Sequence, residues 1–358
     1  MTSRLCYFVL DAAASIGRTL LSPFVTVPVL FAVTYHLDTV SRLLSPLPQG
    51  LALISPPHQS SSLLNVLRVV VAWGILRAAN RALSAIAATS WRLVPAPGWD
   101  WPNEIAVITG GSSGIGKAIA EKLSSMGVRI AVLDIQELPK DLQENPRVHF
   151  FHCDVTIFKS VAAAADAVRN QLGHPSILIN NAGIAKPMTI LETDEVFLRR
   201  IMGVNLMSMW FTTQQFVPYM IETNKGHVVT MASMASFISV PTAADYAATK
   251  AGALAFHETL SLELKHYHKA PNVLTTVAHP NFVKTPLIQG FADNLERKGL
   301  RLLTPEEVAS DIVKQIKKRR GGQLIISKDG SYLAGIRSWP LWLQEGVRDI
   351  IASGAAQR

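Results

Sequence analysis

The sequence predicts an α/β fold: a Rossmann-type, doubly wound parallel sheet of about seven strands with helices on both faces, preceded by hydrophobic membrane-associated helices. Two observations predict it. A buried-strand run from Glu104 to Thr109 leads into the glycine-rich stretch Gly110 to Gly116 and then into a helical pattern. Long apolar segments also precede residue 100 in a chain that is 49% hydrophobic. We therefore expect a membrane-anchoring or interfacial region over residues 1–100, the α/β domain over 101–330 and an apolar tail over 331–358.

The charge distribution favours a membrane surface over nucleic acid as a partner. The net charge is +8, and residues 1–100 hold seven Arg and no Lys against three Asp. Basic residues that flank apolar segments are typical of membrane association. The run Lys317–Arg320 is followed by two glycines, which is typical of a helix C-terminus rather than a nucleic-acid patch. We expect no nucleic-acid partner.

Cysteine and histidine usage predicts neither a disulfide framework nor a metal site. The two cysteines, Cys6 and Cys153, are far apart in the sequence, which fits a reducing compartment for the main domain. The ten histidines show no metal-ligand spacing, and we interpret them as structural or surface residues.

Two apolar segments near the N-terminus are candidates for membrane attachment. Thr19 to Leu37 carries no charge and would measure about 28 Å as a helix, close to the hydrocarbon thickness. Pro23 and Pro28 predict a kinked span or a hairpin-like insertion there, with a cleaved signal peptide as the rival. Leu63 to Trp91 is interrupted by arginines, so an interfacial helix is favoured over a second span. A helical subdomain packed on the main core is the remaining alternative.

The glycine-rich stretch has the properties of a dinucleotide-binding turn. Strand, glycine loop and helix follow in the order that this turn requires, and glycines let a pyrophosphate approach the backbone at a helix N-terminus. The spacing is the wider variant, with three residues between Gly110 and Gly114. The candidate phosphate-binding residues are Gly110, Ser112, Ser113, Gly114, Ile115 and Gly116.

Two acidic strand ends supply the adenosine side of the predicted cofactor site. Asp134 ends the second strand, where a carboxylate can accept hydrogen bonds from ribose hydroxyls and would repel a 2′-phosphate. No Lys or Arg lies inside the glycine loop or directly after Asp134, so NAD(H) is favoured and NADP(H) is possible. Asp154, followed by Val155, ends the third strand and could contact the adenine edge. The alternative for Asp154 is an N-cap for the helix that begins near Ile157, and both could hold.

The candidate catalytic residues lie in and before the stretch Ala244–Lys250. Tyr246 and Lys250 are four positions apart, so a helix presents both on one face. A nearby ammonium would lower the pKa of the phenol toward working pH. Ser233, thirteen positions before Tyr246, could hold the oxygen of an alcohol or carbonyl. Alone, a Tyr/Lys pair is a weak signal and more commonly marks a half-exposed helix face.

Together these motifs resemble the short-chain dehydrogenase/reductase superfamily over about residues 103–330. The fourth strand runs into Asn180-Asn181-Ala182-Gly183, and Val204-Asn205 follows. The resemblance implies that Tyr246 is the catalytic acid/base and that Lys250 binds the nicotinamide ribose and lowers the tyrosine pKa. It also implies that Ser233 orients the substrate oxygen and that Asn205 supports a proton relay. The cofactor wall that it implies includes Asn181, Ala182, Gly183, Tyr246, Lys250, Pro280, Val283 and Thr285.

A subgroup resemblance indicates the substrate class. Asp245-Tyr246 with Phe256-His257-Glu258, and the run Pro280–Thr285 with Asn281 where most of the superfamily has Gly, resemble the membrane-bound retinol dehydrogenases and the 17β-hydroxysteroid dehydrogenase type 11 subgroup. This implies a lipophilic substrate beside Ser233, Met234 and Tyr246. It also implies a location at the endoplasmic reticulum or lipid droplet with the catalytic domain facing the cytosol. A homodimer through helices near 194–223 and 244–268 is possible.

Three functions follow from these expectations. The leading one is a membrane-anchored, NAD(P)-dependent oxidoreductase that interconverts a retinoid, steroid or long-chain alcohol and its ketone or aldehyde. A reductase of a polyketide or terpenoid intermediate would use the same residues. A non-catalytic dinucleotide-binding membrane scaffold is the third, and the intact set Ser233, Tyr246 and Lys250 argues against it.

Overall fold

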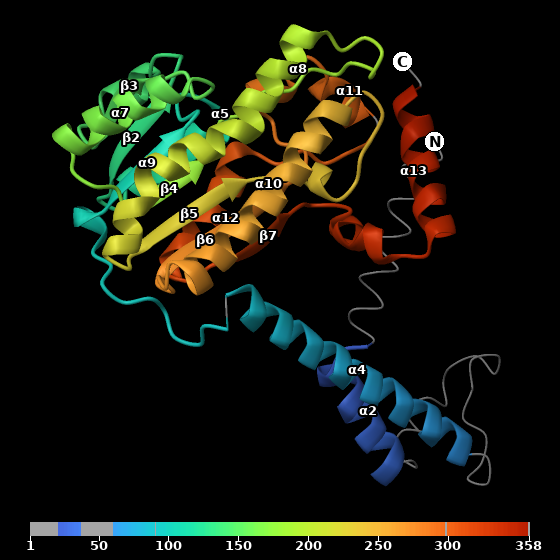
Figure 1. Cartoon of the computed structure of the whole chain (residues 1–358). Coiled ribbons are helices and arrows are strands. Elements are labelled where there is room, and N and C mark those ends of the chain that lie inside the picture. Colours follow the sequence, from blue (N-terminus) through green and yellow to red (C-terminus); the bar gives the residue numbers. More distant parts are fainter. Residues whose placement is uncertain (1–20, 37–59, 90, 298, 357–358) are drawn as a thin grey trace. The chain divides into compact units, whose positions relative to one another are not determined.

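The computed structural model describes residues 21–36, 60–89, 91–297 and 299–356. The chain divides into two compact units, one ending at Trp91 and one beginning at Arg92 (Figure 1). The larger unit thus begins before the boundary expected at residue 100. Each unit is described separately below.

The larger unit is built on a seven-stranded sheet in which every neighbouring pair is parallel. The spatial order is β3-β2-β1-β4-β5-β6-β7. The chain therefore winds outward in one direction from β1 and then in the other direction from β4, as expected for a doubly wound sheet. The strands are β1 Ile105–Thr109, β2 Arg129–Asp134, β3 Val148–His152, β4 Ile177–Asn180, β5 Gly226–Met231, β6 Val273–Pro280 and β7 Gly322–Ile326.

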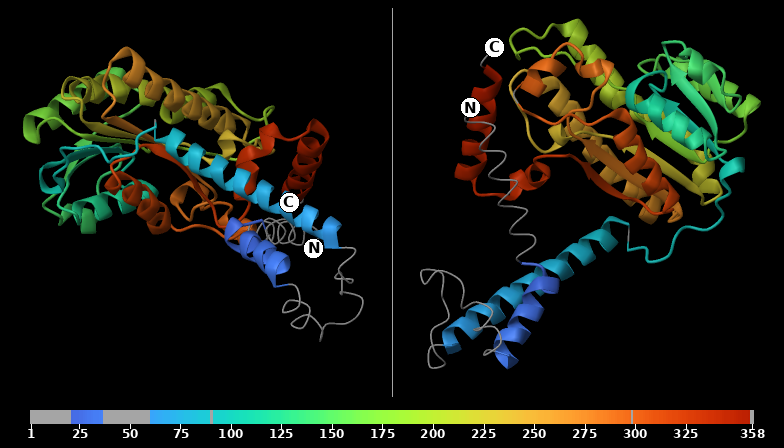
Figure 2. Two further views of the ribbon diagram at one scale, coloured as in Figure 1. Left: turned by 90° about the horizontal axis from the view of Figure 1, so that it is seen from below. Right: turned by 180° about the vertical axis from the view of Figure 1, so that it is seen from behind.

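Helices cover both faces of this sheet (Figures 1 and 2). One face packs against α5 (Gly114–Ser124), α6 (Lys140–Gln143) and α12 (Pro305–Lys317). The other face packs against α7 (Phe158–Gln171), α9 (Ser208–Glu222) and α10 (Ala244–Leu262). Burial on both faces explains why the central strands are continuous apolar runs rather than alternating patterns.

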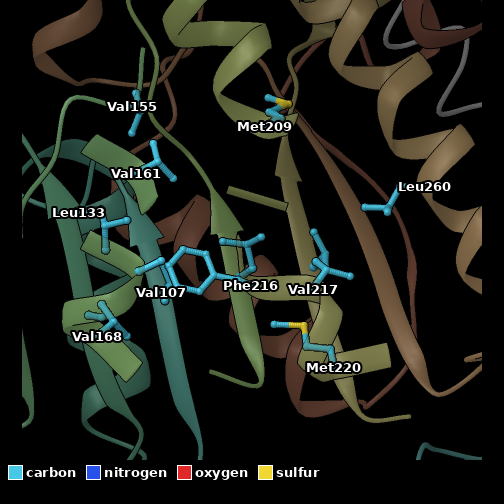
Figure 3. Packing of buried hydrophobic residues seen from close by; sticks show 14 of the residues in the cluster. Val107, Leu133, Val155, Val161, Val168, Met209, Phe216, Val217, Met220 and Leu260 are labelled. Atoms are coloured by element: carbon cyan, nitrogen blue, oxygen red, sulfur yellow. The ribbon is translucent and has the colours of Figure 1, made fainter. Parts of the chain in front are cut away.

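The core on the α7/α9 face shows how the layers interdigitate (Figure 3). Phe216 of α9 points at the sheet and packs in one cluster with Val107 of β1 and Leu133 of β2, both fully buried. Val161 and Val168 of α7 close the same cluster from the helix layer. Burying side chains of this size contributes about 1.5–3 kcal/mol each. This packing fixes the strands whose ends carry the candidate site.

The amino ends of the strands are closed by the segment that precedes β1. Glu104 comes directly before β1 and is buried, with 3% of its surface exposed. Its carboxylate accepts hydrogen bonds from Ser176 Oγ and from the Asp100 amide, and pairs with Lys225 Nζ at 2.7 Å. Ser176 and Lys225 directly precede β4 and β5. Three strands are thus joined at this edge through one carboxylate.

The smaller unit contains two helices that pack on each other, α2 (Pro23–Tyr35) and α4 (Ser60–Ala88). α2 is 13 residues long, or about 20 Å, which is shorter than the span expected for Thr19–Leu37, of which residues 19, 20 and 37 lie outside the described residues. Within the described residues, α4 over Leu64–Ala88 is long and apolar enough to cross a membrane by length and composition. The sequence favoured an interfacial helix here, with a span as the alternative. Both remain predictions.

The C-terminal segments follow β7. They are the 3₁₀ turns of η7 (Ser331–Ser338) and the helix α13 (Leu341–Ala356). η7 is attached to the domain because Arg337 Nε donates to the Phe237 carbonyl at 3.0 Å. α11 (Ala292–Arg297) is a short helix between β6 and α12.

Candidate active site

The predicted site residues gather at the carboxyl ends of the strands. β1 and β4 lie side by side at the centre of the sheet, and the chain turns away from them in opposite directions. Such a switch point leaves a crevice outside the strand ends, where open α/β sheets bind ligands. The glycine loop follows β1 directly and Asn181 to Gly183 follow β4 directly.

The glycine loop leaves no room for side chains at two positions. Gly110 has φ +64°, and a Cβ there would lie 2.9 Å from Ala182 Cα. A Cβ on Gly116 would collide with the Gly110 carbonyl and lie 2.6 Å from Asn181 Nδ2. The glycines therefore serve close packing of the loop on the end of β4, in addition to leaving the backbone open to a phosphate.

Asn181 holds this loop from the neighbouring strand. Its Nδ2 donates to the carbonyls of Thr109 and Gly110 at 3.0 and 2.9 Å. The Thr109 hydroxyl in turn accepts from the amides of Asn181 and Ala182, both at 3.0 Å. Thr109 was not predicted as a site residue. Its position as the last polar residue of a buried strand, directly before the glycine loop, is the signal that could have identified it.

Asp134 lies at the end of β2 with its carboxylate beside the glycine loop. Oδ2 accepts from the Ser112 amide at 3.0 Å, and Oδ1 accepts from the Gln136 amide at 3.0 Å. Ser112 Oγ donates to the Gln136 carbonyl at 2.7 Å, so its hydroxyl is turned toward the β2 end. Ser113 is the N-cap residue of α5 without a side-chain cap bond. Asp134 therefore fixes the loop as well as offering oxygens to a ligand.

Asp154 does not cap α7, and the N-cap expectation was wrong. The N-cap residue is Ile157. Asp154 Oδ1 instead accepts from the Thr156 amide at 2.9 Å and from Thr156 Oγ1 at 2.7 Å. A carboxylate that bonds two residues ahead forms an Asx turn, and this turn ends before the helix starts. Val155 is buried beside it.

Tyr246 and Lys250 lie on the first two turns of α10, as their spacing predicts. The Lys250 ammonium lies 5.6 Å from the centre of the Tyr246 ring. Ser233 follows the end of β5 as the N-cap residue of a short 3₁₀ turn, η4 (Met234–Ser236). Its hydroxyl lies near enough to the Tyr246 side chain to lower the pKa of the phenol. The three predicted catalytic side chains are therefore neighbours.

The electrostatics of this group differ from expectation. Burial raises the pKa of Tyr246, and the nearby Ser233 hydroxyl only partly opposes this rise. We had expected Lys250 to lower the tyrosine pKa, but the desolvation of a phenolate is the dominant effect here. Burial also lowers the pKa of Lys250 from 10.5 to about 8. Lys250 is 3% exposed, and its ammonium donates to the Met231 carbonyl at 2.8 Å.

Asn205 lies on a π-helical turn, η3 (Gly203–Met207), between α8 (Glu195–Met202) and α9. It is fully buried, and its amide pairs with the backbone of Ile184 through two hydrogen bonds of 2.8 and 2.9 Å. A Cβ on Gly183 would lie 3.7 Å from Asn205 Oδ1 and 3.8 Å from Lys250 Nζ. Asn205 thus fixes the segment after β4 beside the lysine. Single π-turns inside helices are frequent at functional sites.

The segment after β6 meets the glycine loop. A Cβ on Gly114, which has φ +53°, would lie 3.1 Å from Thr285 Cγ2. The Pro280 carbonyl is 3.5 Å from Ser233 Oγ, and Val283 is buried. Met234, expected beside the substrate, is also buried. The glycine loop, the ends of β2 and β4, Ser233 and the segment after β6 are therefore linked by contacts at the carboxyl ends of the strands.

The chemistry of this edge defines a class of protein. A glycine loop closed against a strand end at a switch point suits a dinucleotide, and a buried lysine beside a tyrosine suits proton transfer at an oxygen. These are the properties of a nicotinamide-dependent oxidoreductase.

Comparisons with known proteins agree. The family model for short chain dehydrogenases matches residues 104–296, and the chain belongs to this family. It is 42% identical to Dehydrogenase RED2 of Cochliobolus heterostrophus over 50% of this chain and 68% of that protein. It is 33% identical to estradiol 17-beta-dehydrogenase 11 of Homo sapiens (59% and 71% covered) and 31% identical to human epidermal retinol dehydrogenase 2 (66% and 78%). The subgroup resemblance is confirmed.

A solved structure supports the fold. 3-Ketoacyl-(acyl-carrier-protein) reductase from Brucella melitensis, complexed with NADH, has a TM-score of 0.56 at 23% identity over 63% of this chain and 97% of that one. The chain is an NAD(P)-dependent oxidoreductase that interconverts alcohol and carbonyl groups.

Proposed function

We propose that this chain is a membrane-anchored dehydrogenase or reductase of a lipophilic alcohol or its ketone or aldehyde, with Tyr246 as the acid/base. The observation that carries the proposal is the meeting of Tyr246, Ser233 and the buried Lys250 at the strand edge that holds the glycine loop. A retinoid, steroid or long-chain alcohol is the proposed substrate class, in keeping with the names of the relatives.

Each residue has a separate task in this proposal. Nicotinamide, when bound, takes or supplies hydride at the substrate carbon. Tyr246 exchanges the proton at the substrate oxygen, and the Ser233 hydroxyl donates a hydrogen bond to the same oxygen. Lys250 contributes positive charge beside the phenol and reaches the cofactor ribose. Because its raised pKa keeps Tyr246 protonated at neutral pH, the tyrosine is ready to donate its proton in the reductive direction.

The residues that would hold the cofactor fit a dinucleotide. Gly110 and Gly116 keep the loop backbone free of side chains, Thr285 approaches the loop at Gly114, and the half-buried Asp134 carboxylate lies where ribose hydroxyls could donate to it. Asp134 would repel a 2′-phosphate, so we propose a preference for NAD(H) over NADP(H).

The proposed membrane anchor is the α2/α4 pair. Apolar side chains on both helices are strongly exposed, including Phe24 (93%), Phe31 and Trp73. Such surface is costly in water and stable in lipid. We propose attachment to the endoplasmic reticulum or lipid droplet, with the catalytic domain facing the cytosol. Full-length protein should float with phosphatidylcholine vesicles, and Phe31→Glu with Trp73→Glu should weaken flotation. Unchanged flotation of that double variant would show that the α2/α4 pair is not the anchor.

The activity is tested by following NADH absorbance of detergent-solubilised protein with retinoid, steroid and aliphatic alcohols. We expect turnover on at least one lipophilic alcohol and a loss of about 10²–10⁴-fold in kcat for Tyr246→Phe. Tyr267→Phe, at an exposed tyrosine in the π-helical turn that follows α10, is the matched control and should turn over normally. Absence of turnover with all of these alcohols while NADH still binds would contradict the proposed substrate class. Normal turnover by Tyr246→Phe would contradict the mechanism.

A further inference from the structure

His279 is a buried histidine that the proposed reaction does not use. It is the second-last residue of β6 and is fully buried. Its Nδ1 lies 3.1 Å from the Ser233 carbonyl oxygen, and its Nε2 lies 3.1 Å from Gln323 Nε2 on β7. The Phe237 ring packs on it with 4.5 Å between ring centroids. The imidazole thus links the edge strand of the sheet to the catalytic serine.

These two contacts specify one tautomer of the ring. A carbonyl oxygen only accepts, so Nδ1 must carry the proton and donate to Ser233. The amide nitrogen of Gln323 only donates, so Nε2 must be the bare, accepting nitrogen. Burial lowers the pKa of His279 to about 4, which keeps the ring neutral at working pH. With its amide nitrogen facing the ring, Gln323 complements the tautomer that can bind Ser233.

Ser233 needs such support because it lies just beyond the sheet. β5 ends at Met231, and Ala232 still donates its amide to the Ala278 carbonyl at 2.9 Å. The ladder of backbone hydrogen bonds between β5 and β6 ends before Ser233. Its carbonyl then receives His279 Nδ1 and the Ser236 amide, and its hydroxyl lies 3.5 Å from the Pro280 carbonyl. Two successive residues of β6, His279 and Pro280, thus contact its backbone and its side chain.

We propose that His279 is a positioning residue that fixes Ser233 in line with Tyr246, and that Gln323 fixes the tautomer of His279. This inference rests on the proposed function of Ser233 and Tyr246. A hydroxyl that orients a substrate oxygen must be held closely, since a misplacement of about 1 Å can cost about 10²-fold in rate.

The test compares His279→Leu, which removes the donor, with His279→Asn, whose amide can place a donor near the Nδ1 position. We expect His279→Leu to lower kcat by about 10–100-fold, with little change in the KM for NADH, and His279→Asn to recover most of that loss. Gln323→Leu should lower kcat less than His279→Leu. The matched control is His227→Leu, because His227 is also fully buried in a strand and bonds a neighbouring strand through Thr276. It should keep the wild-type kcat per folded molecule.

A pH profile separates positioning from packing. The Ser233 hydroxyl lowers the pKa of Tyr246, so a displaced serine should move the Tyr246 limb of the kcat profile to higher pH. We expect this move in His279→Leu and in Ser233→Ala, and not in His227→Leu. An unmoved profile in His279→Leu, or a His279→Asn variant no better than His279→Leu, would overturn the proposal.

A readout independent of turnover keeps this inference separate from the proposed function. Nitrogen NMR of the wild-type ring should show the proton on Nδ1, and Gln323→Leu should reduce the population of that tautomer. A wild-type ring protonated on Nε2 alone overturns the proposal even in an active enzyme. A protein that shows the Nδ1 tautomer and binds NADH without turning over any alcohol contradicts the proposed function instead.

Discussion

A charged side chain is buried at each end of the strands, and the two differ in how their charge is satisfied. Glu104 lies at the amino ends of the strands (the amino edge) and Lys250 at the carboxyl ends (the carboxyl edge), and both are 3% exposed. Glu104 has an ion pair with Lys225 and two further donors, from Ser176 and Asp100. Among the described residues, Lys250 forms no ion pair; its ammonium donates to the Met231 carbonyl and lies near the Tyr246 ring. The first arrangement stabilises the fold, whereas the second leaves a destabilised charge where chemistry is proposed.

The contrast follows from what each edge must do. Charges removed from water are costly unless they are paired and hydrogen bonded. A carboxylate whose hydrogen bonds are all satisfied is stabilised by the partners that it already has. A lysine whose pKa is lowered to about 8 can respond to a nearby group near working pH.

The largest expected effect is on activity at the carboxyl edge. Lys250→Met removes the charge beside Tyr246 while keeping a similar volume. We expect kcat to fall by about 10²–10⁴-fold because proton transfer loses its electrostatic support. Steady-state NADH assays measure this. Lys225→Met, which removes the lysine of the amino edge, is the control and should keep the wild-type kcat. Equal kcat values for the two variants would show that Lys250 contributes no more to catalysis than Lys225.

The second effect is a pH dependence of stability that belongs to Lys250. This lysine has a pKa of 10.5 in the unfolded chain, and burial lowers its pKa to about 8 in the folded chain. The unfolded state therefore binds more protons between these values, and the free energy of unfolding should rise with pH across that window. The rise attributable to this group is roughly 3 kcal/mol at most. Urea unfolding of wild type and Lys250→Met at pH 7 and pH 10 isolates it. A rise that persists in Lys250→Met would assign it to other groups.

The third effect is on stability at the amino edge. Glu104→Gln removes the charge that Lys225, Ser176 and the Asp100 amide all satisfy. We expect a loss of about 2 kcal/mol in the free energy of unfolding, below the cost for a fully buried pair because Lys225 is partly exposed. Activity per folded molecule should be unchanged. Chemical unfolding measures the first quantity, and a fall in kcat equal to that of Lys250→Met would show that the two edges are not separate in function.

The smallest effect concerns Asp134, whose carboxylate accepts hydrogen bonds from the backbone amides of Ser112 and Gln136. Asp134→Ser should remove the repulsion of a 2′-phosphate and shift the ratio of kcat/KM for NADPH over NADH upward by about tenfold. The control is Asp141→Ser, an exposed acid on α6 that pairs with Lys117. A ratio that does not change would mean that Asp134 acts only through Ser112 and Gln136 as support for the loop.

Local spacing predicted a large part of this molecule. The run before Gly110 is a strand, the glycines pack as the dinucleotide turn requires, and Tyr246 and Lys250 share a helix face. Each of these depends on a few adjacent residues. The order of the motifs then indicated the family, which the comparisons confirmed.

What the sequence did not predict depends on which strands are neighbours. Ser176 and Lys225 meet Glu104 only because β1, β4 and β5 are adjacent in the sheet. His279 reaches Ser233 for the same reason, through β5 and β6. The direction of the pKa shift of Tyr246 depends on burial by the assembled fold. Asp154 does not cap α7 because its carboxylate is bonded to Thr156 in an Asx turn.

The π-helical turn at Gly203–Met207 accommodates one residue that a regular helix would not contain. A π turn holds one residue more than an α turn, and each residue of a helix adds about 100° of rotation. Deleting one residue from it would let α8 and α9 run on as a regular helix. Because the wide turn absorbs the extra residue, Phe216 of α9 would keep its place in the core that Figure 3 shows. The cost would be local, since Asn205 would lose the position from which it bonds the Ile184 backbone.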